Sequence, residues 1–270
     1  MFLKIVIFIL VLVLAFFIVA KYIEARAVFF PDTTVRSTPA VLQLKYRDVF
    51  IKQDRSTTIC GWYIPCPGAK YTVLMFHGNA GNLGDRIDKI SYLNSIGFNL
   101  FIIDYRGYGA SSGKPTVAGV YADAKAAYDY LITEENIPAS KIIIFGVSLG
   151  GAVAVNLAAE VSGYAGLILE GAFSSGRDMA KQIYPYVPNW FFSNKLNSID
   201  KIEKVTAPKL FIHSRRDEIV PFYLAERLFN KAVSPKKLIE IDGGHGEGFI
   251  VSKERYLKAI SEFVESLNRE

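Results

Sequence analysis

Residues 141–152 read KIIIFGVSLGGA, and the arrangement of the rest of the chain can be worked out from them. The first half is an apolar, β-branched run typical of a strand buried on both faces, and the second half changes to small and apolar residues at helical spacing. Ser148 lies at the joint, in Gly146-Val147-Ser148-Leu149-Gly150. So sharp a strand-to-helix turn exposes the serine hydroxyl, which is the pattern of a nucleophile elbow. An ordinary serine in a glycine-rich turn is the alternative, because the pentapeptide alone is weakly specific.

Apolar strands and amphipathic helices alternate on both sides of this stretch. Such alternation predicts an α/β fold, with a mostly parallel sheet covered by helices on both faces. The chain has 270 residues, 51% of them hydrophobic, which is enough for one large domain over residues 40–270. Strands are expected over 41–51, 57–64, 71–76, 99–104, 141–145, 165–170, 209–214 and 237–242, and helices over 85–96, 115–135, 149–160, 222–232 and 252–267.

A serine nucleophile needs a base to take its proton and a third group to orient that base. The chain has three histidines. His245 follows the last expected strand in an irregular glycine-rich turn, where a side chain can reach over the carboxyl edge of the sheet. We therefore predict that His245 is the base, and that His77 in a loop and His213 inside a strand are structural.

Asp217 follows the strand before the one that leads to His245. It completes the order serine, acid, histidine that this architecture uses. Asp242, at the end of the last strand, is the rival orienting acid, although its closeness in sequence makes the side-by-side geometry with His245 harder. Asp104 is expected to organise its own loop, and Glu218 is a weak substitute for Asp217.

A tetrahedral intermediate needs two donors for its oxyanion, and backbone amides supply them without reorganising. The amide of Leu149, just after the nucleophile at a helix N-terminus, is predicted to be one. The turn His77-Gly78-Asn79 after an early strand is placed to supply the other, through the amide of Asn79. A tight turn before a helix is the plainer interpretation of the same residues, and it is compatible with this role.

The N-terminal segment carries an uninterrupted apolar run over residues 5–20, flanked by Lys4 and Lys21. At 1.5 Å per residue the run covers about 24 Å of a roughly 30 Å hydrocarbon layer. With the flanking residues it predicts a single-pass membrane anchor over residues 1–24 and a linker over 25–39. A cleavable signal peptide is the alternative, because Ala25-Arg26-Ala27 has the form of a cleavage site. Basic residues flank both ends of the run, so the side of the catalytic domain stays open.

Residues 174–204 interrupt the alternation with a longer connection, whose middle is rich in proline and aromatic residues. A short lid over the active site and a surface helix pair packed on the core are equally good interpretations. If the segment is a lid, its aromatic side chains are expected to line the path of an acyl chain.

The net charge of +5 is spread over scattered residues, and no nucleic-acid motif is present. We therefore expect no nucleic-acid partner and at most a mild attraction to anionic lipid. The cysteines, Cys60 and Cys66, flank a segment that looks extended. Six strand steps would separate their Cα atoms by about 20 Å, beyond the roughly 7 Å limit for a disulfide, so both are expected to be free thiols.

These motifs together resemble the α/β-hydrolase superfamily and, within it, the ABHD-type membrane-anchored serine hydrolases. The resemblance covers roughly residues 40–268. Ser214, where the family commonly has a glycine, and Gly246-Glu247, where an Asn with an acidic residue is usual, depart from the pattern. The motifs that carry the resemblance are His77-Gly78-Asn79-Ala80-Gly81-Asn82, Asp104-Tyr105-Arg106-Gly107-Tyr108-Gly109, Gly146 to Gly150, Asp217-Glu218-Ile219-Val220-Pro221 and Gly244-His245.

The resemblance implies hydrolysis of carboxylic esters or thioesters through a Ser148 acyl-enzyme, with a small acyl ester, a lipid or an acylated protein as substrate. It implies no metal and no cofactor. A serine peptidase or amidase on the same triad is the first alternative, and a noncatalytic binding protein of the same fold is the second. The oligomeric state stays open.

Overall fold

The computed structural model describes residues 28–188, 190, 192 and 195–268, together with residues 2, 4, 5, 7, 8, 11 and 15. The chain divides into two compact units, Met1–Phe30 and Pro31–Glu270. No helix formed by the described residues is long and apolar enough to cross a membrane. This finding overturns the predicted single-pass anchor over residues 1–24, because the positions described there do not form the run of roughly 20 apolar residues that a span requires. Most of that stretch, and the alternative cleavage site at 25–27, lie outside the described residues.

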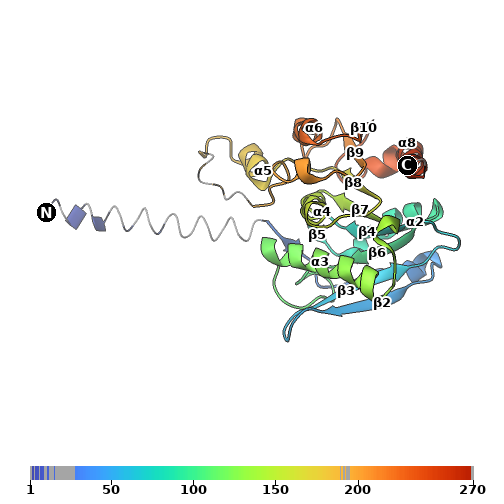
Figure 1. Ribbon diagram of the computed structural model, residues 1–270. Helices are drawn as coiled ribbons and strands as arrows, with labels where there is room; N and C mark the ends of the chain where they lie inside the picture. Colours follow the sequence, from blue (N-terminus) through green and yellow to red (C-terminus); the bar gives the residue numbers. More distant parts are fainter. Residues whose placement is uncertain are drawn as a thin grey trace. The chain divides into compact units, whose positions relative to one another are not determined.

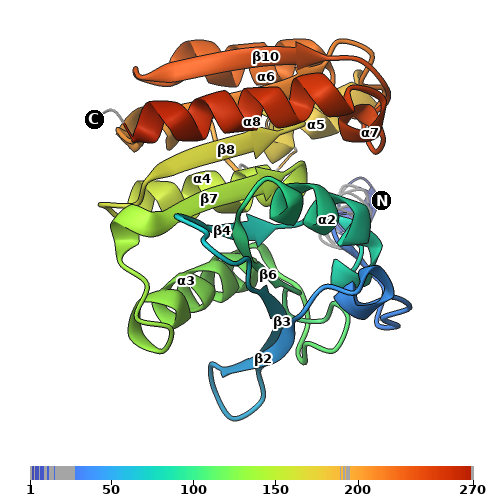
Figure 2. The same cartoon turned by 90° about the vertical axis from the view of Figure 1, so that its right-hand side faces the viewer.

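The second unit is built on an eight-stranded sheet with the order β10-β9-β8-β7-β4-β6-β3-β2 (Figures 1 and 2). β2 pairs antiparallel with β3 and β3 pairs antiparallel with β6, whereas the other neighbouring strands are parallel. The expected mostly parallel sheet is confirmed. The strands of this sheet are β2 (Arg47–Lys52), β3 (Thr58–Ile64), β4 (Thr72–Phe76), β6 (Asn99–Ile103), β7 (Ile142–Val147), β8 (Gly166–Glu170), β9 (Lys209–Ser214) and β10 (Lys236–Ile241).

Helices cover both faces of this sheet, as expected. Figures 1 and 2 show α2 and α8 over one face and α3, α4 and α6 over the other. The parallel arrows of β7, β8 and β10 end on the side of α5 and α7 (Figure 2), which is therefore the carboxyl edge. The helices are α2 (Ile87–Ser95), α3 (Val117–Thr133), α4 (Leu149–Glu160), α5 (Gly176–Ile183), α6 (Phe222–Lys231), α7 (Gly248–Val251) and α8 (Lys253–Leu267). Short elements are β1 (Phe30–Pro31), β5 (Ala80–Gly81), η1 (Pro39–Leu42), η2 (Leu83–Arg86), η3 (Ala139–Lys141) and η5 (Ile202–Lys204).

The N-terminal part of this unit differs from the prediction. The expected strand over 41–51 is split between η1 and the shorter β2, because Pro39 opens a 3-10 turn and Gln43 ends it at φ 57°. The compact unit begins at Pro31 rather than near residue 40. The side chain of Asn82 donates to the carbonyls of Asp32 and Thr34, and these bonds join the expected linker to the domain. Cys60 and Cys66 are free thiols, as expected.

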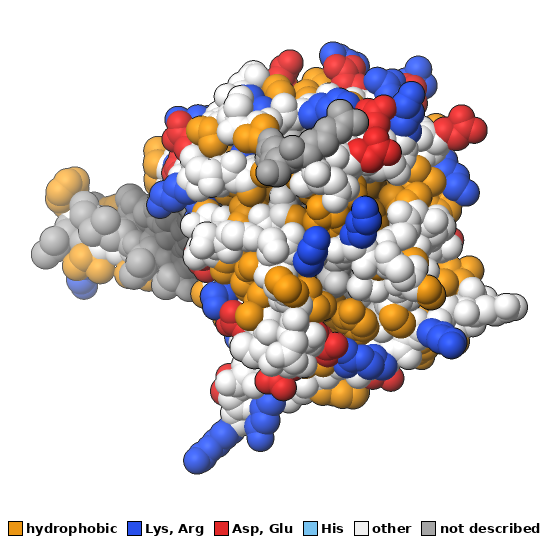
Figure 3. All heavy atoms as spheres, turned by 45° about the vertical axis from the view of Figure 1, so that its right-hand side comes forward, with side chains coloured by type: hydrophobic (Ala, Val, Ile, Leu, Met, Phe, Trp, Pro, Cys, Tyr) orange, Lys and Arg blue, Asp and Glu red, His pale blue; other side chains and the backbone are white. Residues whose placement is uncertain are grey.

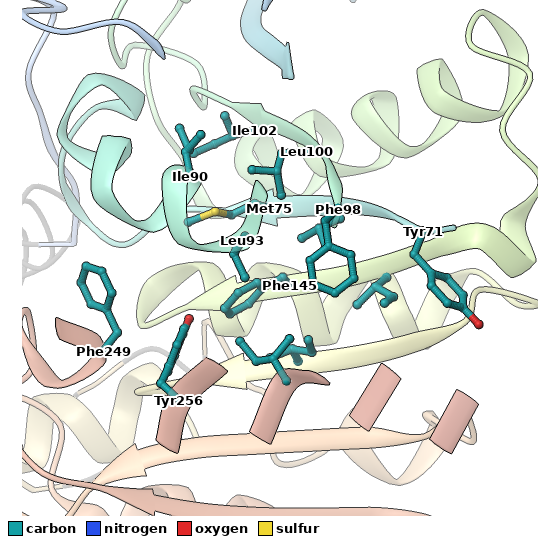
Figure 4. Packing of buried hydrophobic residues seen from close by; sticks show 14 of the residues in the cluster. Tyr71, Met75, Ile90, Leu93, Phe98, Leu100, Ile102, Phe145, Phe249 and Tyr256 are labelled. Atoms are coloured by element: carbon teal, nitrogen blue, oxygen red, sulfur yellow. The ribbon is translucent and has the colours of Figure 1, made fainter. Parts of the chain in front are cut away.

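A continuous apolar core fills the space between the sheet and helices α2, α7 and α8 (Figure 4). Alternate residues of β4, Val73 and Met75, face this core, and Ile90 and Leu93 meet them from α2. All four are 0–1% exposed. Each such side chain contributes roughly 1.5–3 kcal/mol by leaving water, so the layer beneath the carboxyl edge is rigidly packed.

The charged side chains do not gather on the face drawn in Figure 3, where lysines and arginines lie among aspartates and glutamates. On this face the basic side chains are thus scattered rather than concentrated in one patch.

Candidate active site

Ser148 stands between the end of β7 and the first residue of α4, at the carboxyl edge of the sheet. Its backbone angles are φ 53° and ψ −115°, a conformation that a residue with a side chain rarely adopts. The amide of Ser148 donates to the carbonyl of Glu170 at 2.8 Å, and the carbonyl of Ser148 accepts from the amide of Gly151 at 2.8 Å. Both bonds hold the strained turn, as expected where strain persists at a functional position.

Two glycines of the elbow are required by close backbone approach. A Cβ at Gly146 would lie 2.2 Å from the carbonyl oxygen of Gly150, and a Cβ at Gly150 would lie 2.0 Å from that of Phe76. Real Cβ atoms do not come so close, so any larger residue would push α4 away from β4 and β7. The glycines therefore let the helix begin directly behind the serine.

The structure brings Ser148, His245 and Asp217 into one chain of contacts. His245 Nε2 lies 2.9 Å from Ser148 Oγ, and His245 Nδ1 lies 2.7 Å from Asp217 Oδ2. The three residues follow β7, β9 and β10, which are parallel and lie within four adjacent strands of the sheet, so their carboxyl ends meet at one edge.

The hydrogen bonds of Asp217 determine which nitrogen of His245 carries the proton. Burial alone would raise the pKa of Asp217, but hydrogen bonds from His245 and the Val220 amide outweigh it, and the pKa lies below its ordinary value. The amides of Ile219 and Val220 both donate to Asp217 Oδ1. Because the carboxylate is ionised, it accepts a hydrogen bond from Nδ1–H, which keeps the proton on Nδ1 and leaves Nε2 to accept from the serine hydroxyl.

The other acids considered from the sequence have different surroundings. Asp242 is exposed, and its amide and carbonyl bond the hydroxyl of Ser252. Glu218 accepts the backbone amide of His245 at 3.0 Å and so contacts the turn rather than the ring. Asp104 accepts the amide of Leu83 at 2.8 Å, which ties it to the loop that precedes α2.

The remaining histidines are both buried. The ring of His213 donates from Nε2 to the carbonyl of Val220 at 2.8 Å, and its burial lowers the pKa despite the opposing influence of that carbonyl and of Asp217. His77 Nδ1 lies 2.7 Å from the carbonyl oxygen of Gly78 and Nε2 lies 3.2 Å from Asp104 Oδ1. Neither ring is hydrogen-bonded to Ser148.

The turn after β4 comes close to the serine. A Cβ built on Gly78 would lie 3.6 Å from the Cβ of Ser148, and the Tyr105 hydroxyl holds the turn by donating to the carbonyl of His77 at 2.9 Å. Leu149 begins α4, where the first amides have no intrahelical acceptor. The amides of Leu149 and Asn79 are thus on segments adjacent to Ser148, and their role as oxyanion donors stays a prediction.

The described residues of segment 174–204 contain one α-helix, α5, and the short 3-10 helix η5 at its end. Asp178 attaches α5 to the domain, because it accepts from the hydroxyl of Ser174 and pairs with Arg227 of α6 at 3.0 Å. Tyr186 and Trp190 are 98% and 71% exposed. The helix pair considered from the sequence is not seen among the described residues, and the lid stays a prediction.

Comparisons with known proteins match a family model, curated relatives and solved structures to this chain. A family model described as "Serine aminopeptidase, S33" matches residues 67–200. Alpha/beta hydrolase domain-containing protein 17B of Homo sapiens is 36% identical over 216 residues, which cover 79% of this chain and 73% of the relative. Protein bem46 of Schizosaccharomyces pombe is 35% identical over 210 residues, covering 74% and 70%. The structure of the Pyrococcus furiosus esterase Pf2001 has a TM-score of 0.72 at 24% identity, covering 88% of this chain and 99% of that chain.

Proposed function

Because this chain belongs to the α/β-hydrolase superfamily, and within it to the ABHD type, we propose that it is a serine hydrolase that cleaves carboxylic esters or thioesters through an acyl-enzyme on Ser148. The observation that carries the proposal is the contact chain from Ser148 Oγ to His245 Nε2, 2.9 Å, and from His245 Nδ1 to Asp217 Oδ2, 2.7 Å. No other described serine in the structure has such a chain of contacts to a histidine and an acid.

Acylation would begin when Ser148 Oγ attacks the carbonyl carbon of the substrate and passes its proton to His245 Nε2. The imidazolium that forms is stabilised by the Asp217 carboxylate. The carbonyl oxygen becomes negative and would accept from the amides of Leu149 and Asn79, which are fixed in place before the reaction. Collapse of the intermediate expels the alcohol or thiol, which takes the proton from Nε2.

Deacylation would repeat these steps with water as the nucleophile, activated by the same nitrogen of His245. The product acid leaves and the serine is restored. The residues that act in this sequence are all supplied by the chain itself. The proposed substrates are acyl esters, lipids or acylated proteins, since these present the carbonyl and the leaving group that the sequence of steps needs.

A serine peptidase or amidase on the same triad is the second candidate, favoured by the name of the family model, "Serine aminopeptidase, S33". An amide leaving group is poorer and needs protonation by His245 before it departs. Parallel assays with p-nitrophenyl acyl esters, acyl thioesters and aminoacyl p-nitroanilides separate the candidates by kcat/KM.

Replacing Ser148 by alanine is the direct test. Ser148→Ala should lower ester hydrolysis by roughly 10⁴-fold or more and abolish labelling by a fluorophosphonate probe, because the attacking oxygen is removed. Thermal unfolding should change little, since a single hydroxyl is lost. The matched control is Ser162→Ala, which changes an exposed serine just after α4 and should keep both the ester hydrolysis and the probe labelling. A labelled and active Ser148→Ala variant would remove Ser148 from the mechanism.

A further inference from the structure

A buried ion pair lies at the end of β8, the strand that pairs with the elbow strand β7. Lys89 of α2 contacts both carboxylate oxygens of Glu170, the last residue of β8, and the hydroxyl of Tyr256 of α8 donates to Glu170 Oε2 at 2.8 Å. The side chains of Lys89 and Glu170 are 6% and 7% exposed. The proposed reaction uses none of these three groups.

Aromatic rings complete the surroundings of the ammonium group. Lys89 Nζ lies 3.8 Å from the ring centroid of Phe249 in α7, within cation–π range. Figure 4 shows Phe249 beside Tyr256, whose hydroxyl points away from α8, and their ring centroids are 6.0 Å apart. The network therefore joins α2, β8, α7 and α8.

A gain in folding stability does not by itself explain why the Lys89–Glu170 ion pair is buried here. Burying two opposite charges costs about as much as their attraction returns, and apolar residues of similar volume are often as stable or more so. Burial lowers the pKa of Lys89 against the opposing effect of Glu170, and burial together with the Glu170 charge raises the pKa of Tyr256 well above its ordinary value. Tyr256 is therefore a neutral donor over the working pH range.

The backbone of Glu170 leads straight to the site. Its carbonyl accepts the amide of Ser148 at 2.8 Å, the bond that holds the strained elbow. The next residue, Gly171, has φ 57°, and a Cβ there would lie 3.1 Å from His245 Cε1. Glu170, Gly171, Asp217 and His245 also line one small cavity of about 10 Å³, room for a single water.

The other members of the network connect to the remaining parts of the site. Phe249 lies four residues after His245, and the α2 helix that carries Lys89 follows the turn of Asn79 through η2. The segments that carry the serine, the histidine and the proposed oxyanion donor are thus each connected to the Lys89–Glu170 ion pair, through β8, α7 and α2. A displacement of Glu170 would move its carbonyl, which accepts the amide of Ser148, and the neighbouring Gly171, which packs against the His245 ring.

We propose that Lys89, Glu170 and Tyr256 are positioning residues, which hold the Ser148 amide and the His245 ring in the geometry that acyl transfer requires. The proposal rests on the proposed hydrolase function for its effect on rate, but its effect on the elbow can be measured without activity. It acts through Ser148 and His245 and does not place these three side chains in contact with substrate.

Two variants test it. Tyr256→Phe removes only the hydroxyl that bonds Glu170, and the double variant Lys89→Met/Glu170→Gln removes both charges together, so that neither is left buried alone. Tyr164→Phe is the matched control, because its hydroxyl is also buried and donates to a carbonyl, that of Ala158 in the last turn of α4, at the end of the helix away from Ser148. Rates are measured with a p-nitrophenyl acyl ester, and hydrogen exchange is followed in the peptide that spans Ser148.

We expect kcat to fall roughly 10-fold in Tyr256→Phe and up to about 100-fold in the double variant with KM nearly unchanged, because sub-ångström misplacement acts on the reacting atoms rather than on binding. The Ser148 amide should exchange faster in both variants, whereas Tyr164→Phe should change neither quantity. If Tyr256→Phe keeps the wild-type kcat and the wild-type exchange of Ser148, the proposal is wrong, whether or not the double variant folds. A wild-type protein that hydrolyses none of the esters overturns the proposed function, and faster Ser148 exchange would then still support the bracing of the elbow.

Discussion

His245 and His213 face the same carboxylate, and comparing them shows what separates a reactive ring from a structural one. His245 Nδ1 lies 2.7 Å from Asp217 Oδ2, and His213 Nε2 lies 3.4 Å from the same oxygen. The His245 side chain is 14% exposed and presents its second nitrogen to Ser148. His213 is 1% exposed, and its Nδ1 has no hydrogen-bond partner in the described part of the chain.

A histidine beside a carboxylate, such as His213 beside Asp217, is therefore not necessarily a general base. His213 belongs to β9, so its ring is fixed in the core and its Nε2 donates to the carbonyl of Val220. The amide of Val220 in turn donates to Asp217 Oδ1 at 2.7 Å. His213 thus closes the loop that presents Asp217. His245 stands in a turn outside any strand, where the ring can face both an acid and a hydroxyl.

Exchanging each histidine for glutamine tests this contrast most strongly. His245→Gln should lower ester hydrolysis by roughly 10⁴-fold or more, because glutamine cannot take the serine proton. His213→Gln should keep the rate within about 10-fold, since the glutamine amide can still donate to the Val220 carbonyl. Steady-state kcat on one p-nitrophenyl ester, with folding checked by circular dichroism, compares the two. Equal losses in both variants would mean that His213 shares in the chemistry.

The acid between the two rings gives the next largest expected effect. Asp217→Asn should lower kcat by roughly 10⁴-fold, as the same change does in the well-known serine-protease case, because an amide favours the wrong tautomer of His245. Asp242→Asn is the control: its side chain is exposed and should matter little. A larger loss in Asp242→Asn than in Asp217→Asn would reverse the assignment.

The smallest expected effect is on stability and comes from His213. Burial holds the pKa of His213 below the 6.5 expected of the unfolded chain. Between the folded pKa and 6.5 the unfolded chain binds more protons, so this group lowers the free energy of unfolding as the pH falls through that window, by at most about 1.4 kcal/mol per pH unit. Above it the contribution is constant.

Thermal unfolding from pH 7 to 5 measures this contribution. The melting temperature of the wild type should fall more steeply than that of His213→Gln, by roughly 2–4 °C for each kcal/mol of difference. The lowered pKa of Asp217 changes the free energy of unfolding near and below pH 3.8, outside the pH 7 to 5 range in which His213 is compared. Parallel curves for the two proteins would show that His213 is not held neutral by burial.

Local sequence was sufficient for most of the strands and for the elbow. β9 has the predicted bounds, and β7, β8 and β10 differ from theirs by one or two residues, because a continuous apolar run between turn residues has few other uses in an α/β chain. Local sequence was insufficient at residues 31–45, where the pattern predicted a linker up to residue 39 and a strand from residue 41. Hydrogen bonds from Asn82, 50 and 48 positions away, hold residues 32 and 34 against the domain, and no local pattern shows them.

The candidate site divides in the same way. Ser148, Asp217 and His245 could be proposed together from motif and chain order, because parallel strands deliver their following loops to one edge. The network of Lys89, Glu170 and Tyr256 could not be predicted in this way. Lys89 and Tyr256 lie 81 and 86 positions from Glu170, and each of the three looks locally like an ordinary residue of a helix or a strand end.

The sequence alone settled the α/β architecture and the order of its elements, because hydrophobic periodicity and glycine turns act over a few neighbouring residues. The sequence favoured Asp217 over Asp242 and a structural His213, but only the folded chain showed the contact of Asp217 with His245, the burial of His213 and the buried charge pair of Lys89 and Glu170. Those facts depend on which strands become neighbours and on how loops close over long stretches of chain. Such contacts form between side chains that are distant in sequence, so the packing of the whole domain determines them.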